Sequence, residues 1–193
     1  AGTLERFRPG LEGRFELFRQ FGDARRIEIA PGFHTSTTHV ASGSAPSRVF
    51  STDWMFRFAN PVELTGFFYT GENVAHFGTG GIRQGFSILG PGNIVSVGSR
   101  GGWTQLKLTA TSRLSFHIMA GQQDDRDSDL RAGPGAQGPA GGVSKNQAYG
   151  ANFFYRLAPN FVMSFETMQT RTRYLISGKR LINHYDLAFA YLF

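Results

Sequence analysis

The sequence predicts an all-β protein whose antiparallel strands run up and down and form a transmembrane β-barrel. Three observations support this fold class. Apolar and polar residues alternate with a period of two along most of the chain, which places them on opposite faces of strands. A composition with 19 Phe and 25 Gly in 193 residues is typical of strands and turns rather than helices. Short turns alternate with longer links, as they do in membrane barrels.

Composition excludes several other classes. No segment approaches the ~20 consecutive apolar residues that a membrane-spanning helix requires. A mean hydropathy of −0.23 is compatible with a membrane barrel, because only alternate residues of its strands are apolar. The chain has no cysteine, which excludes disulfides and thiolate metal sites. Its net charge of +6 is scattered among acidic residues, so no nucleic-acid partner is expected.

The strands can be placed in order from the alternation. Nine are expected, at residues 11–21, 26–40, 50–58, 62–69, 103–110, 114–120, 149–157, 161–174 and 181–193. Pro31 indicates a bulge in the second of them. Residues 86–89 and 94–97 either form a further hairpin or belong to a folded-in loop, so the total is nine or eleven.

The connections fall into two groups. Short turns are expected at 22–25, 59–61, 111–112 and 158–160, and longer links at 41–48, 71–81, 122–145 and 175–179. The longest link, 122–145, combines the acidic run Asp124–Asp129 with a Gly/Pro-rich segment, which predicts a solvated surface loop.

The last strand has the most specific pattern. One face carries apolar and aromatic residues up to the terminus, and the other carries His184 and Asp186 followed by small residues. The apolar face consists of Tyr185, Leu187, Phe189, Tyr191 and Phe193. This pattern resembles the C-terminal assembly signal of Gram-negative outer-membrane β-barrel proteins. The resemblance implies location in the bacterial outer membrane, contact with the lipid bilayer and lipopolysaccharide, and recognition of this strand by the barrel-assembly machinery. A soluble antiparallel barrel or sandwich is the alternative.

The resemblance also sets the direction of every strand. With Phe193 at the periplasmic side, each short turn is periplasmic and each long link, including 122–145, is extracellular. Bacterial single-chain barrels have an even number of strands, whereas nine or eleven are expected here. We therefore expect residues 1–193 to be one β-barrel domain that forms the C-terminal part of a larger barrel, with homo-oligomerisation as a further expectation.

The polar face of the strands supplies the candidate pore lining. It comprises Arg14, Glu16, Arg26, Glu28, Asp53, Arg57, Glu63, Lys107, His117, Arg156, Glu166, His184 and Asp186, together with Glu12, His34 and Gln105. Arg14 and Glu16 lie across a turn from Arg26 and Glu28, so a ladder of opposite charges is expected there. Such residues either line a water-filled channel or cross-pair and fill a narrow barrel.

The resemblance implies a porin-like channel for passive diffusion of small hydrophilic solutes. The alternative is a structural or adhesin barrel with a filled interior and binding by its outer loops. Strand number separates the two, because ~8–10 strands give a filled interior and ~16 leave an aqueous channel.

An outer-membrane hydrolase is the third hypothesis. It would use His184 and Asp186 with Ser164 on the neighbouring strand, or a site near His34 and His39, provided that a Ser/His/Asp cluster assembles.

Two motifs resemble ligand-binding patterns. Asp125, Asp127 and Asp129 follow the spacing of a calcium loop, but Leu130 replaces the required Gly, which leaves only loose divalent binding or a solvated charge run. Gly78 and Gly80 lack the strand-to-helix context of a dinucleotide site. No metal or cofactor is expected.

Overall fold

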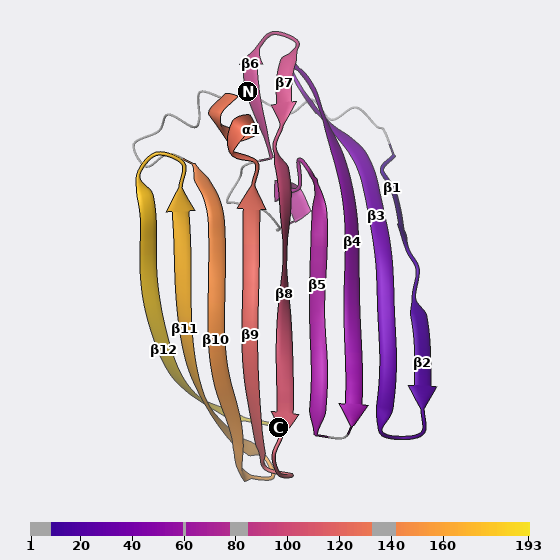
Figure 1. The fold of residues 1–193 in the computed structure, drawn as a ribbon, viewed down its shortest axis with the longest axis vertical. Helices are drawn as coiled ribbons and strands as arrows, with labels where there is room; N and C mark the ends of the chain where they lie inside the picture. Colours follow the sequence, from indigo (N-terminus) through magenta and orange to yellow (C-terminus); the bar gives the residue numbers. More distant parts are fainter. Residues whose placement is uncertain (1–8, 60, 78–84, 133–141) are drawn as a thin grey trace.

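One large antiparallel sheet makes up most of the protein (Figure 1). The computed structural model describes residues 9–59, 61–77, 85–132 and 142–193. The strands of this sheet are β1 (Leu11–Arg14), β2 (Leu17–Phe21), β3 (Arg25–Val40), β4 (Gly43–Ala59), β5 (Val62–Glu72), β8 (Gly98–Thr109), β9 (Leu114–Asp125), β10 (Val143–Ala158), β11 (Phe161–Tyr174) and β12 (Gly178–Tyr191).

From β2 onward, each strand of this sheet pairs with the sheet's next strand along the chain, which confirms the up-and-down topology. The sheet has ten strands, but β1 and β2 both pair with β3, so it is nine strands wide. Its two edges, β1/β2 and β12, are not hydrogen-bonded to each other within the described residues, so the sheet is an open barrel wall.

The predicted strand 11–21 is interrupted opposite Pro31. β1 pairs with residues 32–35 of β3 and β2 with residues 25–29, while Phe15 N donates to Pro31 O at 2.9 Å. The predicted bulge in β3 is wrong, because β3 and β4 pair without a register shift from Arg26 to Val40. Pro31 has no N–H and cannot donate a backbone hydrogen bond to the neighbouring strand. The neighbouring strand is therefore interrupted, between β1 and β2, whereas β3 continues.

The segment 86–97 forms the hairpin that was one of its two predicted alternatives. Strands β6 (Phe86–Gly90) and β7 (Asn93–Ser96) make a separate sheet that projects beyond the ends of β5 and β8 (Figure 1). Ser96 Oγ donates to Pro46 O at 2.9 Å, and this bond ties the hairpin to β4. Gly78 and Gly80 lie outside the described residues.

The predicted loop 41–48 is wrong. β4 begins at Gly43, directly paired with Val40, and Ala45 and Ser47 are fully buried. Ser47 Oγ donates to Asn73 O at 3.1 Å. Contacts of this kind from distant segments override the turn preference of a Ser/Gly/Pro-rich sequence. Pro46 lies beyond the last β4–β5 pair, where β4 has a single neighbour, as suits a residue without an N–H.

The predicted loop 122–145 is only partly correct. Strand β9 continues to Asp125, β10 begins at Val143, and helix α1 (Asp127–Ala132) lies between them. Residues 133–141 lie outside the described residues. The helix buries Leu130, and its first turn carries Asp127 and Asp129, which favour a helix N-terminus. No helix within the described ranges is long and apolar enough to cross a membrane.

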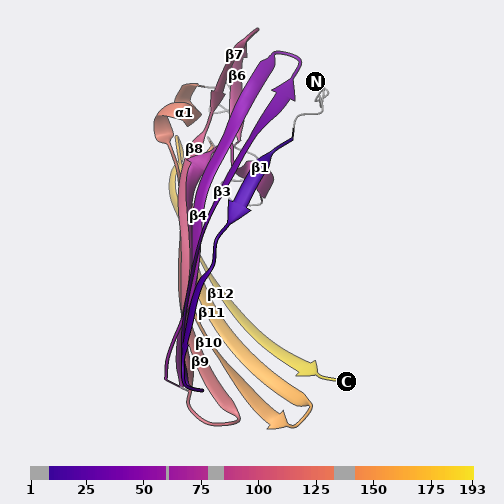
Figure 2. The ribbon, with the colours of Figure 1, turned by 90° about the vertical axis from the view of Figure 1, so that its right-hand side faces the viewer.

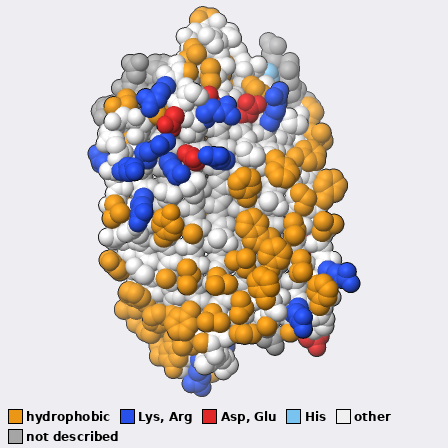
Figure 3. All heavy atoms as spheres, in the orientation of Figure 1, with side chains coloured by type: hydrophobic (Ala, Val, Ile, Leu, Met, Phe, Trp, Pro, Cys, Tyr) orange, Lys and Arg blue, Asp and Glu red, His pale blue; other side chains and the backbone are white. Residues whose placement is uncertain are grey.

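The sheet is curved, and its two faces differ. Figure 2 shows β9–β12 sweeping to the concave side, where the short helix η1 (Ala75–Phe77) also lies. Figure 3 shows the convex face: hydrophobic side chains cover its middle and lower parts, and charged ones gather above them. Exposed apolar residues of this face include Phe68, Leu106, Ile118, Phe165 and Leu187.

Candidate functional site

The concave face collects the residues that the sequence predicts as pore-lining. Directly opposed residues on neighbouring strands share a face of the sheet, so the register assigns them. His34 contacts Phe77 of η1, with ring centroids 4.5 Å apart, which identifies the concave face. Because alternate residues of a strand point to opposite faces, the predicted pore-lining residues that belong to strands all lie on this concave face. Glu16, between β1 and β2, reaches Arg14 from the link. Their role in lining a pore stays a prediction.

A single transverse row on this face contains about half of the charged candidates, and we call it the charged row. Its members are successive register partners from β3 to β12: Arg26, Arg57, Glu63, Lys107, His117, Asn152, Glu166 and Asp186. The alternation predicts which face each residue occupies, but only the register shows that they lie at one level. In a closed wall such a row becomes a ring of charged side chains.

Charge is unevenly distributed along the charged row. The three cations, Arg26, Arg57 and Lys107, come from β3, β4 and β8, with Glu63 between the last two. Two carboxylates, Glu166 and Asp186, face each other at the other end, on β11 and β12. The row is therefore basic toward one edge of the sheet and acidic toward the other.

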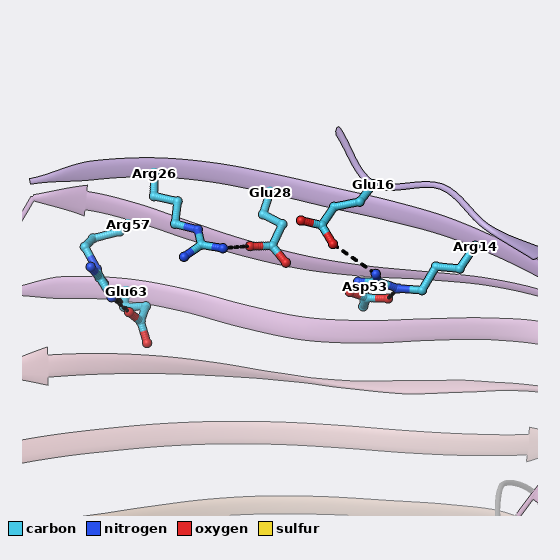
Figure 4. A network of polar contacts seen from close by, with 7 residues as sticks. All are labelled: Arg14, Glu16, Arg26, Glu28, Asp53, Arg57 and Glu63. Atoms are coloured by element: carbon cyan, nitrogen blue, oxygen red, sulfur yellow. Dashed lines mark hydrogen bonds and ion pairs between the residues drawn. The ribbon is translucent and has the colours of Figure 1, made fainter. Parts of the chain in front are cut away.

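Local ion pairs hold several of these side chains. Arg57 donates to Glu63 Oε2 from Nη2 at 2.8 Å and from Nε at 3.2 Å. Arg26 Nη2 donates to Glu28 Oε2 at 2.5 Å (Figure 4). Asn152 Nδ2 donates to Glu166 Oε2 at 3.1 Å. These contacts order the charged groups and leave much of each arginine accessible, since the Arg26 and Arg57 side chains are 39% exposed.

The predicted charge ladder across the first turn is wrong. Arg14 pairs with Glu16, at 3.1 Å, and with Asp53 on β4, while Arg26 pairs with Glu28 (Figure 4). The register places Arg14 opposite Gly32 and Arg26 opposite Gln20, so the two charged pairs do not face each other across the turn. The charges therefore pair within each segment or reach across β3.

A second feature of the concave face was missed by sequence reasoning. A hollow of about 500 Å³, which we call the histidine pocket, lies between the sheet and η1. Its lining includes Arg14, His34, Phe67, Tyr69 and Phe77. Phe67 and Tyr69 stack at 5.9 Å. The sequence feature that could have indicated this pocket is the His76-Phe77 pair, which lies in the predicted loop 71–81.

Asn73 anchors η1 above this pocket. It has φ of 52°, a left-handed conformation that Asn adopts more readily than most residues. Its backbone N donates to Val97 O at 3.0 Å, and its side-chain Nδ2 donates to Thr38 Oγ1 at 3.1 Å. Burial lowers the pKa of His76, and the neighbouring His34 lowers it further.

Of the two proposed hydrolase sites, the cluster of Ser164, His184 and Asp186 does not assemble among the described residues. His184 Nε2 contacts Asp186 Oδ2, but Ser164 lies opposite Ala188, four residues along β12 and thus ~13 Å away. His34 does contact Ser36, at 2.8 Å, and Glu12, at 3.3 Å. Glu12 is 79% exposed, whereas the acid of a catalytic triad is buried and fixed.

The acidic run 124–129 is engaged rather than simply solvated, which corrects that expectation. Asp124 pairs with Arg100 at 3.2 Å, and Asp127 pairs with Arg173 at 2.9 Å. Asp129 accepts a bond from Gly98 N at 3.0 Å. The described residues contain no group of three or more His, Cys, Asp or Glu side chains placed to hold a metal ion.

Four of the predicted assembly-signal residues, Tyr185, Leu187, Phe189 and Tyr191, lie on the convex face of β12, and Phe193 follows the strand. Phe189 stacks on Phe161 of β11 at 6.0 Å, and Tyr191 meets Phe193 edge-on at 5.2 Å. Tyr185, Leu187, Phe189 and Tyr191 are all more than half exposed. β12 ends at Tyr191, two residues before the predicted end. The signal function itself stays a prediction.

Comparison with known proteins adds one structural likeness. No family model and no curated protein sequence matches the chain. The fold is similar to the crystal structure of the outer membrane channel DcaP of Acinetobacter baumannii, with a TM-score of 0.79 and 12% identity. The match covers 96% of this chain and 51% of that one, so the chain spans about half the length of the channel. The chain therefore has the fold of part of an outer-membrane channel's β-barrel wall.

Proposed function

We propose that this chain forms part of the wall of a porin-like channel in the bacterial outer membrane, through which small hydrophilic solutes diffuse passively. The observation that carries the proposal is the contrast between the two faces of one sheet. The charged row lies on the concave face, and an apolar band lies on the convex face.

The contrast has a direct physical meaning. A strand that meets lipid on one side and water on the other must alternate apolar and polar residues. Leu106 and Lys107 are adjacent in β8, and they point to opposite faces. Exposed apolar side chains over so wide a surface are costly in water, whereas a bilayer covers them. The similarity to a channel fold supports the same assignment.

Passive diffusion fits the chemistry of the concave face. Its charged residues are of both signs and are partly exposed, as in the pair Arg57 and Glu63. A water-filled lumen lined in this way admits polar solutes and discriminates among them by charge. A barrel with a filled interior and binding outer loops is the alternative, and its ion pairs would be closed to water.

Planar-bilayer recording of the purified full-length protein tests the proposal. We expect steady ohmic conductance. The double variant E63Q/E166Q, which removes two carboxylates from the charged row, should shift ion selectivity toward anions. The matched control D23N/E72Q removes two carboxylates away from that row and should change selectivity less. A correctly inserted protein without conductance would contradict the channel and favour the filled barrel.

The remaining partners belong to the same proposal. We propose that the aromatic row of β12, Tyr185 to Phe193, is recognised by the barrel-assembly machinery, and that the convex apolar band contacts lipid. The free edge that β12 presents among the described residues supports the first assignment, since an unpaired edge strand is a template for pairing with another chain.

A further inference from the structure

Cations are concentrated at one corner of the convex face. One transverse row there runs Arg100, Asp124, Lys145, Arg173 and Lys179, each directly opposite the next on neighbouring strands. The row below it adds Arg171, opposite Gln147. Figure 3 shows Lys and Arg side chains gathered above the hydrophobic part of this face. Like charges placed directly opposite one another are destabilising unless an anion lies between them.

The protein supplies only part of the compensating charge. Asp124 lies 3.7 Å from Lys145 Nζ, and Asp127 pairs with Arg173. Arg171 and Lys179 have no carboxylate within ion-pair distance among the described residues. Residues 133–141 contain no acidic residue. Arg171 is held by Gln169 Oε1 at 2.8 Å and lies over the Tyr149 ring at 5.5 Å.

These cations surround a depression, which we call the cationic hollow. It measures about 460 Å³ and is lined by Lys145, Arg171, Arg173 and Lys179 on the convex face. The lining contains no acidic residue. Arginine presents a planar fork of donors that suits phosphate oxygens, and lysine adds a compact positive charge. The geometry therefore suits a ligand that carries phosphate.

The position of the hollow indicates where that phosphate comes from. Tyr149 lies on the same face four residues below Lys145, ~13 Å along the strand. Apolar residues such as Phe153 and Phe165 follow below it. A tyrosine at the upper border of an apolar band marks a membrane–water interface. The cationic hollow thus lies at the level of lipid headgroups, and its ligand approaches from the side of the bilayer.

We propose that the cationic hollow binds the phosphate groups of lipopolysaccharide, the phosphorylated glycolipid of the outer leaflet. This proposal rests on the proposed outer-membrane function, because it needs the convex face to meet lipid. The strand direction set by the terminal aromatic row of β12 places the upper end of β10–β12 on the outer side. A glycolipid with several phosphates can bridge Arg171 and Lys179, which a singly charged headgroup cannot.

Binding of purified lipopolysaccharide to the detergent-solubilised full-length protein tests this site. The double variant R171Q/K179Q should bind it about 30-fold more weakly than the wild type, since each surface cation contributes about fivefold to binding an anionic membrane. The matched control R19Q/R113Q also removes two positive charges, but from exposed positions at the other end of the sheet. Its affinity should remain that of the wild type. Dephosphorylated lipopolysaccharide, phosphatidylglycerol and inorganic phosphate serve as competitors.

The outcomes separate this proposal from the channel itself. Equal affinity of R171Q/K179Q and the wild type for lipopolysaccharide would overturn the proposed site. Competition by phosphatidylglycerol or by dephosphorylated lipopolysaccharide as strong as that by intact lipopolysaccharide would also overturn it. Competition by inorganic phosphate at matched concentration would identify a free-anion site and also overturn it. Conductance of R171Q/K179Q in planar bilayers should match the wild type, because the hollow is on the lipid side. Absence of conductance in the wild-type protein would instead contradict the proposed channel function.

Discussion

Arg14 on β1 and Asp53 on β4 form a two-point ion pair across the intervening strand β3. Arg14 Nη2 lies 2.7 Å from Asp53 Oδ1, and Nε lies 3.1 Å from Oδ2. The pair crosses β3 where its side chains are small, at Ala30 and Gly32. It therefore joins the interrupted first strand to the wall and presents both charges to the concave face.

Substitution of Asp53 should change ion selectivity. In D53N the guanidinium of Arg14 keeps only Glu16 as an anionic partner, and the concave face, which lines the proposed pore, loses one negative charge. We expect the reversal potential under a salt gradient to shift toward anions. D23N, in the first turn, removes the same charge away from the pair and should have a smaller effect. An equal shift in D53N and D23N would show that the Arg14–Asp53 pair does not face the permeation path.

Gly66 in β5 should not tolerate a side chain. A Cβ atom there would lie 2.6 Å from Trp54 Cε2 and 2.7 Å from Trp103 O, both far inside van der Waals contact. G66A should lower the free energy of unfolding by about 1–3 kcal/mol, the usual cost of overpacking. Urea unfolding in detergent measures this. G90A, at a position with open space around it, is the control, and equal stability of the two variants would contradict the prediction.

Acidification should loosen η1 from the wall. Burial and His34 lower the pKa of His76 below its ordinary value of 6.5. The packed form therefore binds fewer protons than the released form, and its stability is lost as the pH falls below 6.5. After correction for the intrinsic pH dependence of amide exchange, the protection of residues 73–77 should be lower at pH 5 than at pH 7.5. H76Q should reduce this dependence and H184Q, on a distant strand, should keep it. An unchanged pH response in H76Q would assign the effect to another group.

The terminal aromatic row predicts an assembly phenotype. F193A should reduce severalfold the amount of folded protein in the outer membrane, because it removes the last member of the row that we propose the assembly machinery recognises. L192A, on the opposite face of the same segment, should assemble more nearly as the wild type does. Heat modifiability on gels measures the folded fraction. Equal assembly of the two variants would contradict the signal.

Alternation of residue types was sufficient to predict most of the sheet. It places Leu187 outward and Asp186 inward, because a strand has only two faces. It does not reveal register, so it could not show that Glu63 and Glu166 occupy one transverse row or that Arg14 reaches Asp53. Register depends on pairing between segments, and a single strand carries little information about it.

The errors arose where distant contacts decide local structure. Residues 43–47 read as a loop from their Ser, Gly and Pro content, yet Ser47 is held by Asn73 and Pro46 by Ser96. Helix α1 was missed because its Asp127 and Asp129 read as a solvated acidic run, whereas Arg173 and Gly98 engage them. The histidine pocket depends on η1 folding back onto the sheet, which no local pattern indicates.

In the proposed channel, the uneven charge of the charged row would affect how a solute travels, and not only which solute passes. Arg26 and Arg57 lie toward one edge of the wall, and Glu166 and Asp186 lie toward the other. Opposite charges separated across a lumen produce an electric field perpendicular to the direction of transport. A zwitterion at this level would turn its anionic end toward β3–β4 and its cationic end toward β11–β12. Molecules of equal size and zero net charge would then pass at rates that depend on their dipole moments.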